Sequence, residues 1–181
     1  MKPDIKSVLK DASQSFEETF NYYFNEKVSP ENESETKLWA ISSLIHLDQI
    51  RLFEAYDSCS VAGFPRLLWM AEIFSKLFEA KKWYFRKGIN LLHDVAEAKG
   101  QLDQVKIKIS DLRKNHDLET IKRFKDYRDK FGYHYDEKAI VFLKDFTNEE
   151  YDTFIKVLMT FIKFSQQWLL ILREIITIKV Q

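Results

Sequence analysis

The chain has 181 residues, of which 45% are apolar and 31% charged, and its formal net charge is zero. This length suffices for a core that needs no cross-links, and we expect one domain over residues 1–181. Four glycines and three prolines are too few for a turn-rich all-β protein. Zero net charge excludes a general attraction to nucleic acid. The single cysteine, Cys59, excludes a disulfide framework and a cysteine-based zinc site, and it fits a reducing compartment.

The location of the protein is predicted from its apolar segments. No long apolar run follows the N-terminus, so we expect no secretory signal. The apolar stretch 154–180 contains Lys156, Lys163, Arg173 and Glu174, and we expect these charges to keep it from spanning a membrane. The sequence therefore predicts a cytoplasmic protein without a membrane partner.

Apolar residues recur at helical spacing through most of the chain. This pattern predicts helices over residues 4–27, 35–60, 66–99, 101–131 and 147–178. Residues 28–34 contain a proline among polar residues and predict a loop. Residues 136–146 are short and rich in β-branched side chains, and we interpret them as a connector that could be extended. The predicted fold class is all-α, an up-and-down bundle of four to five long helices.

Several residues predict where these helices begin, bend and end. Pro65 suits the first turn of the third helix, and Gly100 suits its end. Gly88 predicts a bend or the close approach of a neighbour. A restart within the fourth region is expected near Asn115 or Asp117. Thr147 and Glu150 form the capping-box pattern that opens the last helix.

The four histidines are candidate metal ligands. The chain contains no Glu-x-x-His, which excludes the usual di-iron bundle. His46 followed by His93-Asp94, with a second His-Asp pair at His116, vaguely resembles the ligand order of metal-dependent phosphohydrolases. The competing interpretation, which we favour, is that His46 and His93 are core or helix-face residues satisfied by their neighbours. Because phosphate-loop and nucleophile motifs are also absent, we expect no metal and no cofactor.

The segment Lys125-Asp-Tyr-Arg-Asp-Lys-Phe-Gly-Tyr-His-Tyr-Asp136 combines the residue types of a reactive site. Arg128 and His134 are six positions apart, which on an ideal helix leaves their side chains about 120° apart. Gly132 between them can end the helix and turn the following side chains back. Arg128 and His134 could then face one pocket, with Asp129 beside them.

This segment resembles the Arg-Asn/Asp-Lys-x-x-x-His strings of the HEPN superfamily (higher eukaryotes and prokaryotes nucleotide-binding), known from abortive-infection and toxin systems. The likeness is close over about ten residues and loose over the bundle. Arg86 and His93 also satisfy the family's Arg-x(4–6)-His spacing. The Arg128 match is favoured by its context, namely a polar residue directly after the arginine, a glycine before the histidine and a late position in the chain. The sequence departs from many members in the bulky Phe131, Tyr133 and Tyr135.

The resemblance implies a HEPN-like bundle that is a metal-independent endoribonuclease, which cuts RNA by attack of the 2′-OH on the neighbouring phosphate. His134 would be the acid and base, because its ordinary pKa is near neutral. Arg128 would stabilise the phosphorane charge, and Asp129 would orient either group. Lys130, Tyr133 and Tyr135 would contact the substrate, the tyrosines by stacking on a base.

In the family, two such motifs meet across a homodimer axis, so the resemblance also implies a homodimer. It further implies a role in phage defence or in a toxin system with an antitoxin or another partner protein. Two alternatives stay open. The chain is a non-catalytic module that binds nucleotide, RNA or a partner protein, or Arg128 only bonds Asp126 or a carbonyl while His134 closes a turn.

Overall fold

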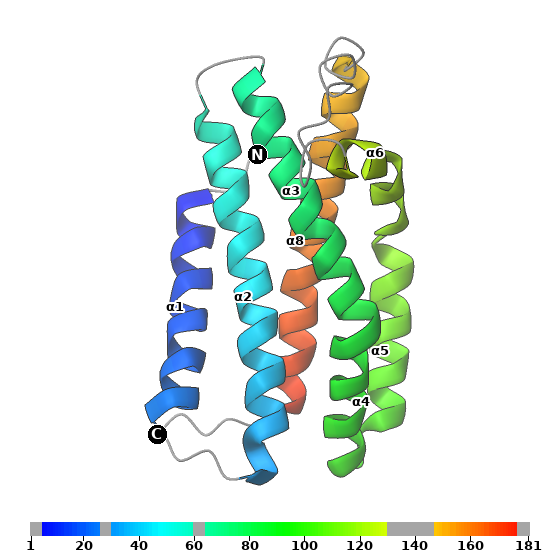
Figure 1. Ribbon diagram of the computed structural model, residues 1–181. Coiled ribbons are helices and arrows are strands. Elements are labelled where there is room, and N and C mark those ends of the chain that lie inside the picture. Colours follow the sequence, from blue (N-terminus) through cyan, green and yellow to red (C-terminus); the bar gives the residue numbers. More distant parts are fainter. Residues whose placement is uncertain (1–4, 26–29, 60–63, 130–146, 177–181) are drawn as a thin grey trace.

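The fold is described from a computed structural model of the chain, for residues 5–25, 30–59, 64–129 and 147–176. Within these ranges the chain forms helices packed side by side and no strand (Figure 1), which confirms the all-α prediction. The elements are α1 (Ile5–Asn25), α2 (Pro30–Ser58), α3 (Phe64–Trp83), the π-helical turn η1 (Tyr84–Gly88), α4 (Ile89–Ala98), α5 (Leu102–Asn115), the 3-10 helix η2 (Glu119–Phe124), α6 (Lys125–Tyr127) and α8 (Asn148–Ile175).

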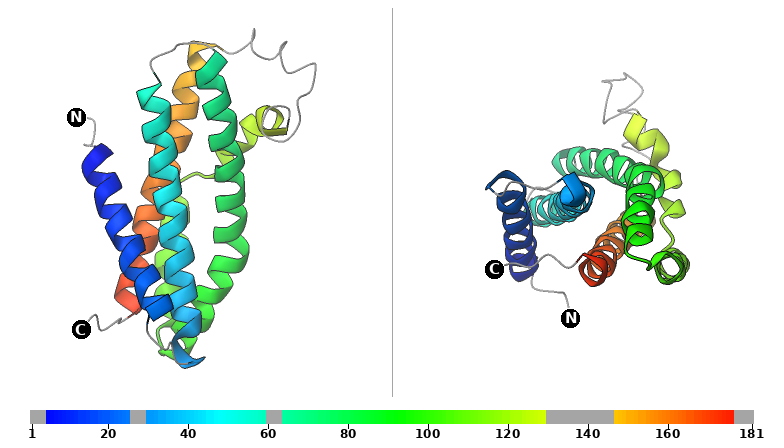
Figure 2. Two further views of the ribbon diagram at one scale, coloured as in Figure 1. Left: turned by 60° about the vertical axis from the view of Figure 1, so that its left-hand side comes forward. Right: turned by 90° about the horizontal axis from the view of Figure 1, so that it is seen from below.

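Consecutive long helices run in opposite directions along the bundle. In Figure 1, α1 descends, α2 rises, α3 and α4 descend as one curved rod, α5 rises and α8 descends. Helix α2 packs against α1, α3, α4 and α8, and α8 also packs against α3 and α5. The end-on view in Figure 2 shows α1 on the outside of the bundle, against α2.

Helix α8 contributes the largest share of big side chains to the core. Phe154, Phe161, Phe164, Trp168 and Leu172 are all almost completely buried. Their spacing of three, four or seven residues places them on one side of the helix. They share one core with buried side chains of α3, including Met70, Ile73, Phe74 and Leu77, and the Phe154 ring centre lies 5.2 Å from that of Phe74. Burial of these faces is the main force that holds the helices together.

The composition of α8 bears on the prediction about membranes. By length and hydropathy alone α8 could cross a membrane, and the expectation that its charges prevent this stays a prediction. Half of its most apolar stretch is buried inside the bundle, and the core helix of a soluble protein passes the same test.

The boundary residues behave largely as predicted. Gly100 adopts a left-handed φ of 68°, and the turn after α4 closes with bonds from the Gly100 N–H to the Glu97 carbonyl (3.0 Å) and from the Gln101 N–H to the Ala96 carbonyl (2.8 Å). This is a Schellman turn, which needs glycine at that position. The capping box of Thr147 and Glu150 is also confirmed.

Three predicted boundaries or elements are wrong. Helix α2 already begins at Pro30, within the predicted loop 28–34, because proline fits a first helical turn. The predicted helix 66–99 is interrupted by the π-helical turn η1. The predicted helical region 101–131 breaks after Asn115, where a restart was expected, but it resumes as a 3-10 helix and not as an α-helix. The predicted connector 136–146 lies outside the described residues.

Gly88, the last residue of the π-helical turn, lies against the indole ring of Trp83. A Cβ atom at Gly88 would come within 2.7 Å of that ring. In an ordinary helix, Gly→Ala stabilises by about 0.5–1 kcal/mol. Here we expect the opposite effect: Gly88→Ala should lower the free energy of unfolding by about 1–2 kcal/mol. The new methyl group would displace the Trp83 ring and so disturb its contacts with Tyr84 and Trp168. Urea denaturation tests this, and an unchanged or higher midpoint would contradict it.

Candidate functional site

The predicted reactive segment, which starts at Lys125, is preceded by a short 3-10 helix, η2, that the sequence had not indicated. Asp117 lies just before this helix and accepts bonds from the Glu119 N–H (2.8 Å) and the Thr120 hydroxyl (2.6 Å). The restart expected near Asp117 is therefore confirmed, although the residue at the N-cap position is Leu118. Residues three apart face the same way in a 3-10 helix. Leu118, Ile121 and Phe124 are spaced in this way, and all three are buried.

The 3-10 helix is attached to α3 by an aromatic stack and by an ion pair. Phe124 stacks on Phe74 with ring centres 4.3 Å apart. Glu119 forms ion pairs with Lys122 (2.6 Å) and with Lys81 of α3 (2.7 Å). Hydrogen bonds from Lys122 and Lys81 lower the pKa of Glu119 to about 2, so this carboxylate stays charged at neutral pH. The start of the reactive segment is therefore fixed to the bundle.

Arg128 follows directly after α6, and three contacts orient its guanidinium group. The Nε atom donates to Oδ1 of Asp129 at 2.7 Å, and Nη2 bonds the same oxygen. The guanidinium carbon lies 4.4 Å from the centre of the Phe78 ring on α3, which is a cation–π arrangement. The Arg128 side chain is 23% exposed to solvent, and the Asp129 side chain is 43% exposed. Arg128 is therefore held in place while part of it still reaches solvent.

The structure thus brings together Arg128 and Asp129, two of the predicted catalytic residues. Among the described residues, the carboxylate that pairs with Arg128 is Asp129 and not Asp126. The rest of that alternative, in which Arg128 bonds a carbonyl and His134 closes a turn, stays a prediction. His134, the predicted acid and base, lies outside the described residues. So do the predicted substrate contacts Lys130, Tyr133 and Tyr135. Phe78 was not predicted as a partner of Arg128. The helical spacing of apolar residues identifies Phe78 as a core residue, but it does not show which charged side chain packs on its ring.

The residues of the metal-site alternative do not gather. Among the described residues there is no group of three or more His, Cys, Asp or Glu side chains that could hold a metal ion, and His46, His93 and Asp94 are all described. His46 Nδ1 lies 2.7 Å from the Ser165 hydroxyl. His116 Nδ1 lies 3.1 Å from the Leu112 carbonyl. The phosphohydrolase ligand set is therefore wrong, and His46 is the satisfied core histidine that the competing interpretation expected.

A buried polar cluster between α2 and α8 is a feature that the sequence did not reveal. Most hydrogen bonds form when His46 Nδ1–H donates to the Ser165 hydroxyl oxygen. The Ser165 hydroxyl then donates either to Gln49 Oε1 at 3.0 Å or to the Ile162 carbonyl at 2.9 Å. Burial lowers the pKa of His46 to about 4. These groups are sealed from solvent, so the cluster positions the two helices and has no access for a substrate.

The known proteins to which the chain was compared provide no relative from which a role could be transferred. No protein-family model, no curated protein and no solved structure matches the chain.

Proposed function

We propose that this protein is a HEPN-like, metal-independent endoribonuclease that cuts RNA by attack of a 2′-OH group on the adjacent phosphate. One observation carries the proposal: the Arg128 guanidinium is held by Asp129 and Phe78 and is still partly exposed. A fixed cation at the surface is what an enzyme needs to stabilise charge that develops on a phosphate. The antiparallel packing of the long helices supports the finer proposal of a HEPN-like, up-and-down bundle (Figure 1).

In this mechanism His134 acts as base and then as acid. It removes the proton of the 2′-OH, the 2′-oxygen bonds to phosphorus, and the bond from phosphorus to the 5′-oxygen of the next nucleotide breaks. The proton passes to that 5′-oxygen, so the products carry a 2′,3′-cyclic phosphate and a 5′-OH. Arg128 stabilises the doubly charged phosphorane with the N–H groups that Asp129 does not use. Asp129 orients Arg128, and Lys130, Tyr133 and Tyr135 contact the substrate.

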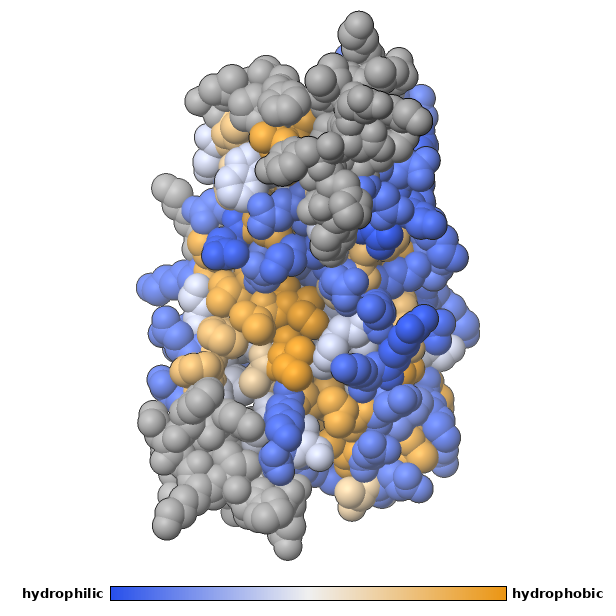
Figure 3. All heavy atoms as spheres, in the orientation of Figure 1, coloured by the Kyte–Doolittle hydropathy of each residue, from blue (hydrophilic) through white to orange (hydrophobic). Residues whose placement is uncertain are grey.

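The proposal includes a homodimer in the cytoplasm, in phage defence or in a toxin system with an antitoxin or other partner protein. A two-fold axis would bring two copies of the Arg128 segment together and double the catalytic set. Figure 3 gives the dimer some support, since apolar side chains gather on the face between α2 and α3. Helix α2 also exposes Ile41 and Leu44. Contiguous exposed apolar surface favours a protein partner.

The experiment is cleavage of end-labelled RNA in EDTA, with analysis of the product ends. We expect wild-type protein to leave 2′,3′-cyclic phosphate. His134→Ala should abolish cleavage, and Arg128→Ala should reduce it by about a hundredfold or more, the usual loss when one charge-stabilising donor is removed. Arg123→Ala is the matched control, because Arg123 is a half-exposed arginine of the neighbouring 3-10 helix. Wild-type cleavage by His134→Ala would refute the assignment.

The second candidate is a non-catalytic module that binds nucleotide, RNA or a partner protein. The observation in its favour is that Asp129 already neutralises the charge of Arg128, so less of that charge is left for a substrate phosphate. Under this proposal no RNA is cut, and binding survives both Arg128→Ala and His134→Ala. Electrophoretic mobility shifts with the same RNA, in parallel with the cleavage assay, distinguish the two candidates.

A further inference from the structure

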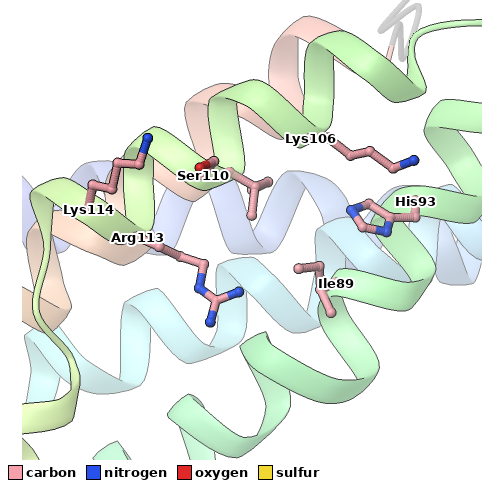
Figure 4. A pocket seen from close by; sticks show the side chains of 7 residues that line it. Ile89, His93, Lys106, Ser110, Arg113 and Lys114 are labelled. Carbon is pink, nitrogen blue, oxygen red and sulfur yellow. The ribbon is translucent and has the colours of Figure 1, made fainter.

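A groove of about 420 Å³ lies between α4 and α5. Helix α4 lines it with Ile89 and His93, while α5 lines it with Lys106, Ile109, Ser110 and Arg113, and with Lys114 as well. Figure 4 shows Lys106 and Arg113 reaching from α5 toward α4, where His93 and Ile89 face them. The volume falls within the range of about 300–1,000 Å³ that is typical of small-ligand sites.

The local sequence explains why these side chains share one groove. The Schellman turn at Gly100 reverses the chain, so α4 and α5 pack against each other in antiparallel directions. Lys106, Ser110 and Arg113 follow one another at four and three residues, which places them on one face of α5. Ile89 and His93 are four residues apart on α4 and share a face in the same way.

The charge in this groove is not compensated by acidic residues. The residues that line it include three cations and no Asp or Glu. Lys106 and Arg113 form no ion pair with any residue that the structure describes, whereas Lys108 on the same helix pairs with Glu174. Lys114 has a distant carboxylate, Asp111, at 3.8 Å. The Arg113 guanidinium carbon lies 4.7 Å from the centre of the Phe85 ring, which is a cation–π arrangement.

We propose that the groove between α4 and α5 binds a phosphate-bearing ligand, supplied either by a free nucleotide or by an RNA strand. Arg113 presents a planar fork that matches two phosphate oxygens, and Lys106 adds a point charge. Ser110 and His93 supply hydrogen-bonding groups. Ile89 and Ile109 offer apolar surface for the ribose or base. Several cations around one opening suit a phosphate better than a single carboxylate, because the attraction grows with ligand charge.

This proposal does not rest on the ribonuclease proposal, because none of its residues belongs to the Arg128 segment. The test is equilibrium binding of two probes at low salt: ADP, and a labelled single-stranded RNA of about twelve nucleotides. Arg113→Gln and Lys106→Gln are measured beside Lys108→Gln. Lys108 is the matched control, because the same substitution removes the same charge from α5 outside the groove. Lys106 and Arg113 are exposed, so the variants are expected to fold.

We expect at least one probe to bind. Arg113→Gln should then weaken that binding at least about tenfold, Lys106→Gln about three- to fivefold, and Lys108→Gln less than about twofold. Binding of ADP would assign the phosphate to a free nucleotide. Binding of RNA without ADP would assign it to the strand. The proposal is overturned if neither probe binds, if Arg113→Gln has no effect, or if Lys108→Gln weakens binding as much as Arg113→Gln.

Discussion

Replacement of Trp168 by alanine is expected to lower the free energy of unfolding by about 3–5 kcal/mol, the usual cost of removing a large aromatic side chain from a core. Trp168 is 1% exposed. The centre of its ring lies 5.0 Å from the ring centre of Tyr84 and 6.3 Å from that of Trp83, both in edge-to-face geometry. It is also stacked with Phe164, with ring centres 6.2 Å apart. Alanine would leave a cavity among these rings. Urea denaturation monitored by circular dichroism measures the change.

Two further variants separate packing from hydrogen bonding at this site. Trp168→Phe keeps much of the ring but removes the bond from Trp168 Nε1 to the Ser42 hydroxyl (3.0 Å), and it should cost about 1–2 kcal/mol. Leu170→Ala is the control on the same helix: Leu170 is 53% exposed, so its loss should cost less than about 1 kcal/mol. If Trp168→Ala costs no more than Leu170→Ala, Trp168 is not in the core.

Acidification from pH 6.5 to pH 4 should destabilise the protein by about 3 kcal/mol through His46 alone. Burial lowers the pKa of His46 to about 4, against an ordinary value of 6.5. In that interval the unfolded chain binds a proton that the folded protein does not, so the free energy of unfolding falls as the pH falls. The free energy of unfolding therefore has its full value above pH 6.5, where His46 is neutral in both states, and falls as the pH drops toward 4.

His46→Gln isolates this contribution, because the variant keeps a polar side chain next to Ser165 but has no group that titrates. Carboxylates and the other histidines titrate in both proteins. The difference in the free energy of unfolding between wild type and His46→Gln should therefore vary with pH by about 3 kcal/mol. Parallel pH dependences of the two proteins would show that His46 is not the group responsible.

Much of the helical architecture could be predicted because its signals are local. Gly100 ends α4 and Thr147 opens α8 through bonds within a few residues, and the sequence identifies both. The errors arose where two local preferences compete. Residues 118–124 carry apolar side chains three apart, which suits a 3-10 helix, but the same residues also fit a looser helical stripe. The π-helical turn that ends at Gly88 places this residue against the Trp83 ring, a contact that apolar periodicity does not express.

The site was predicted in part for a similar reason. Arg128 and Asp129 are neighbours in sequence, so their pairing was accessible. The metal alternative failed because its residues do not form a cluster that could hold an ion, which spacing along the chain cannot show. Arg128 lies over the Phe78 ring because α6 packs against α3, a tertiary contact that the sequence does not show. The position of His134, on which the ribonuclease proposal depends, lies outside the described residues.

By itself the sequence determined the all-α class, most helix ends and the adjacent Arg128–Asp129 pair, because each is set by side chains within a turn or two of one another. The tertiary structure decided which polar residues are buried together and which cations share a groove. His46 contacts Ser165, which is more than a hundred positions away in the sequence. Arg113 of α5 and His93 of α4 line the same groove. Such contacts depend on the rotation of each helix about its axis, and packing of the whole core fixes that rotation.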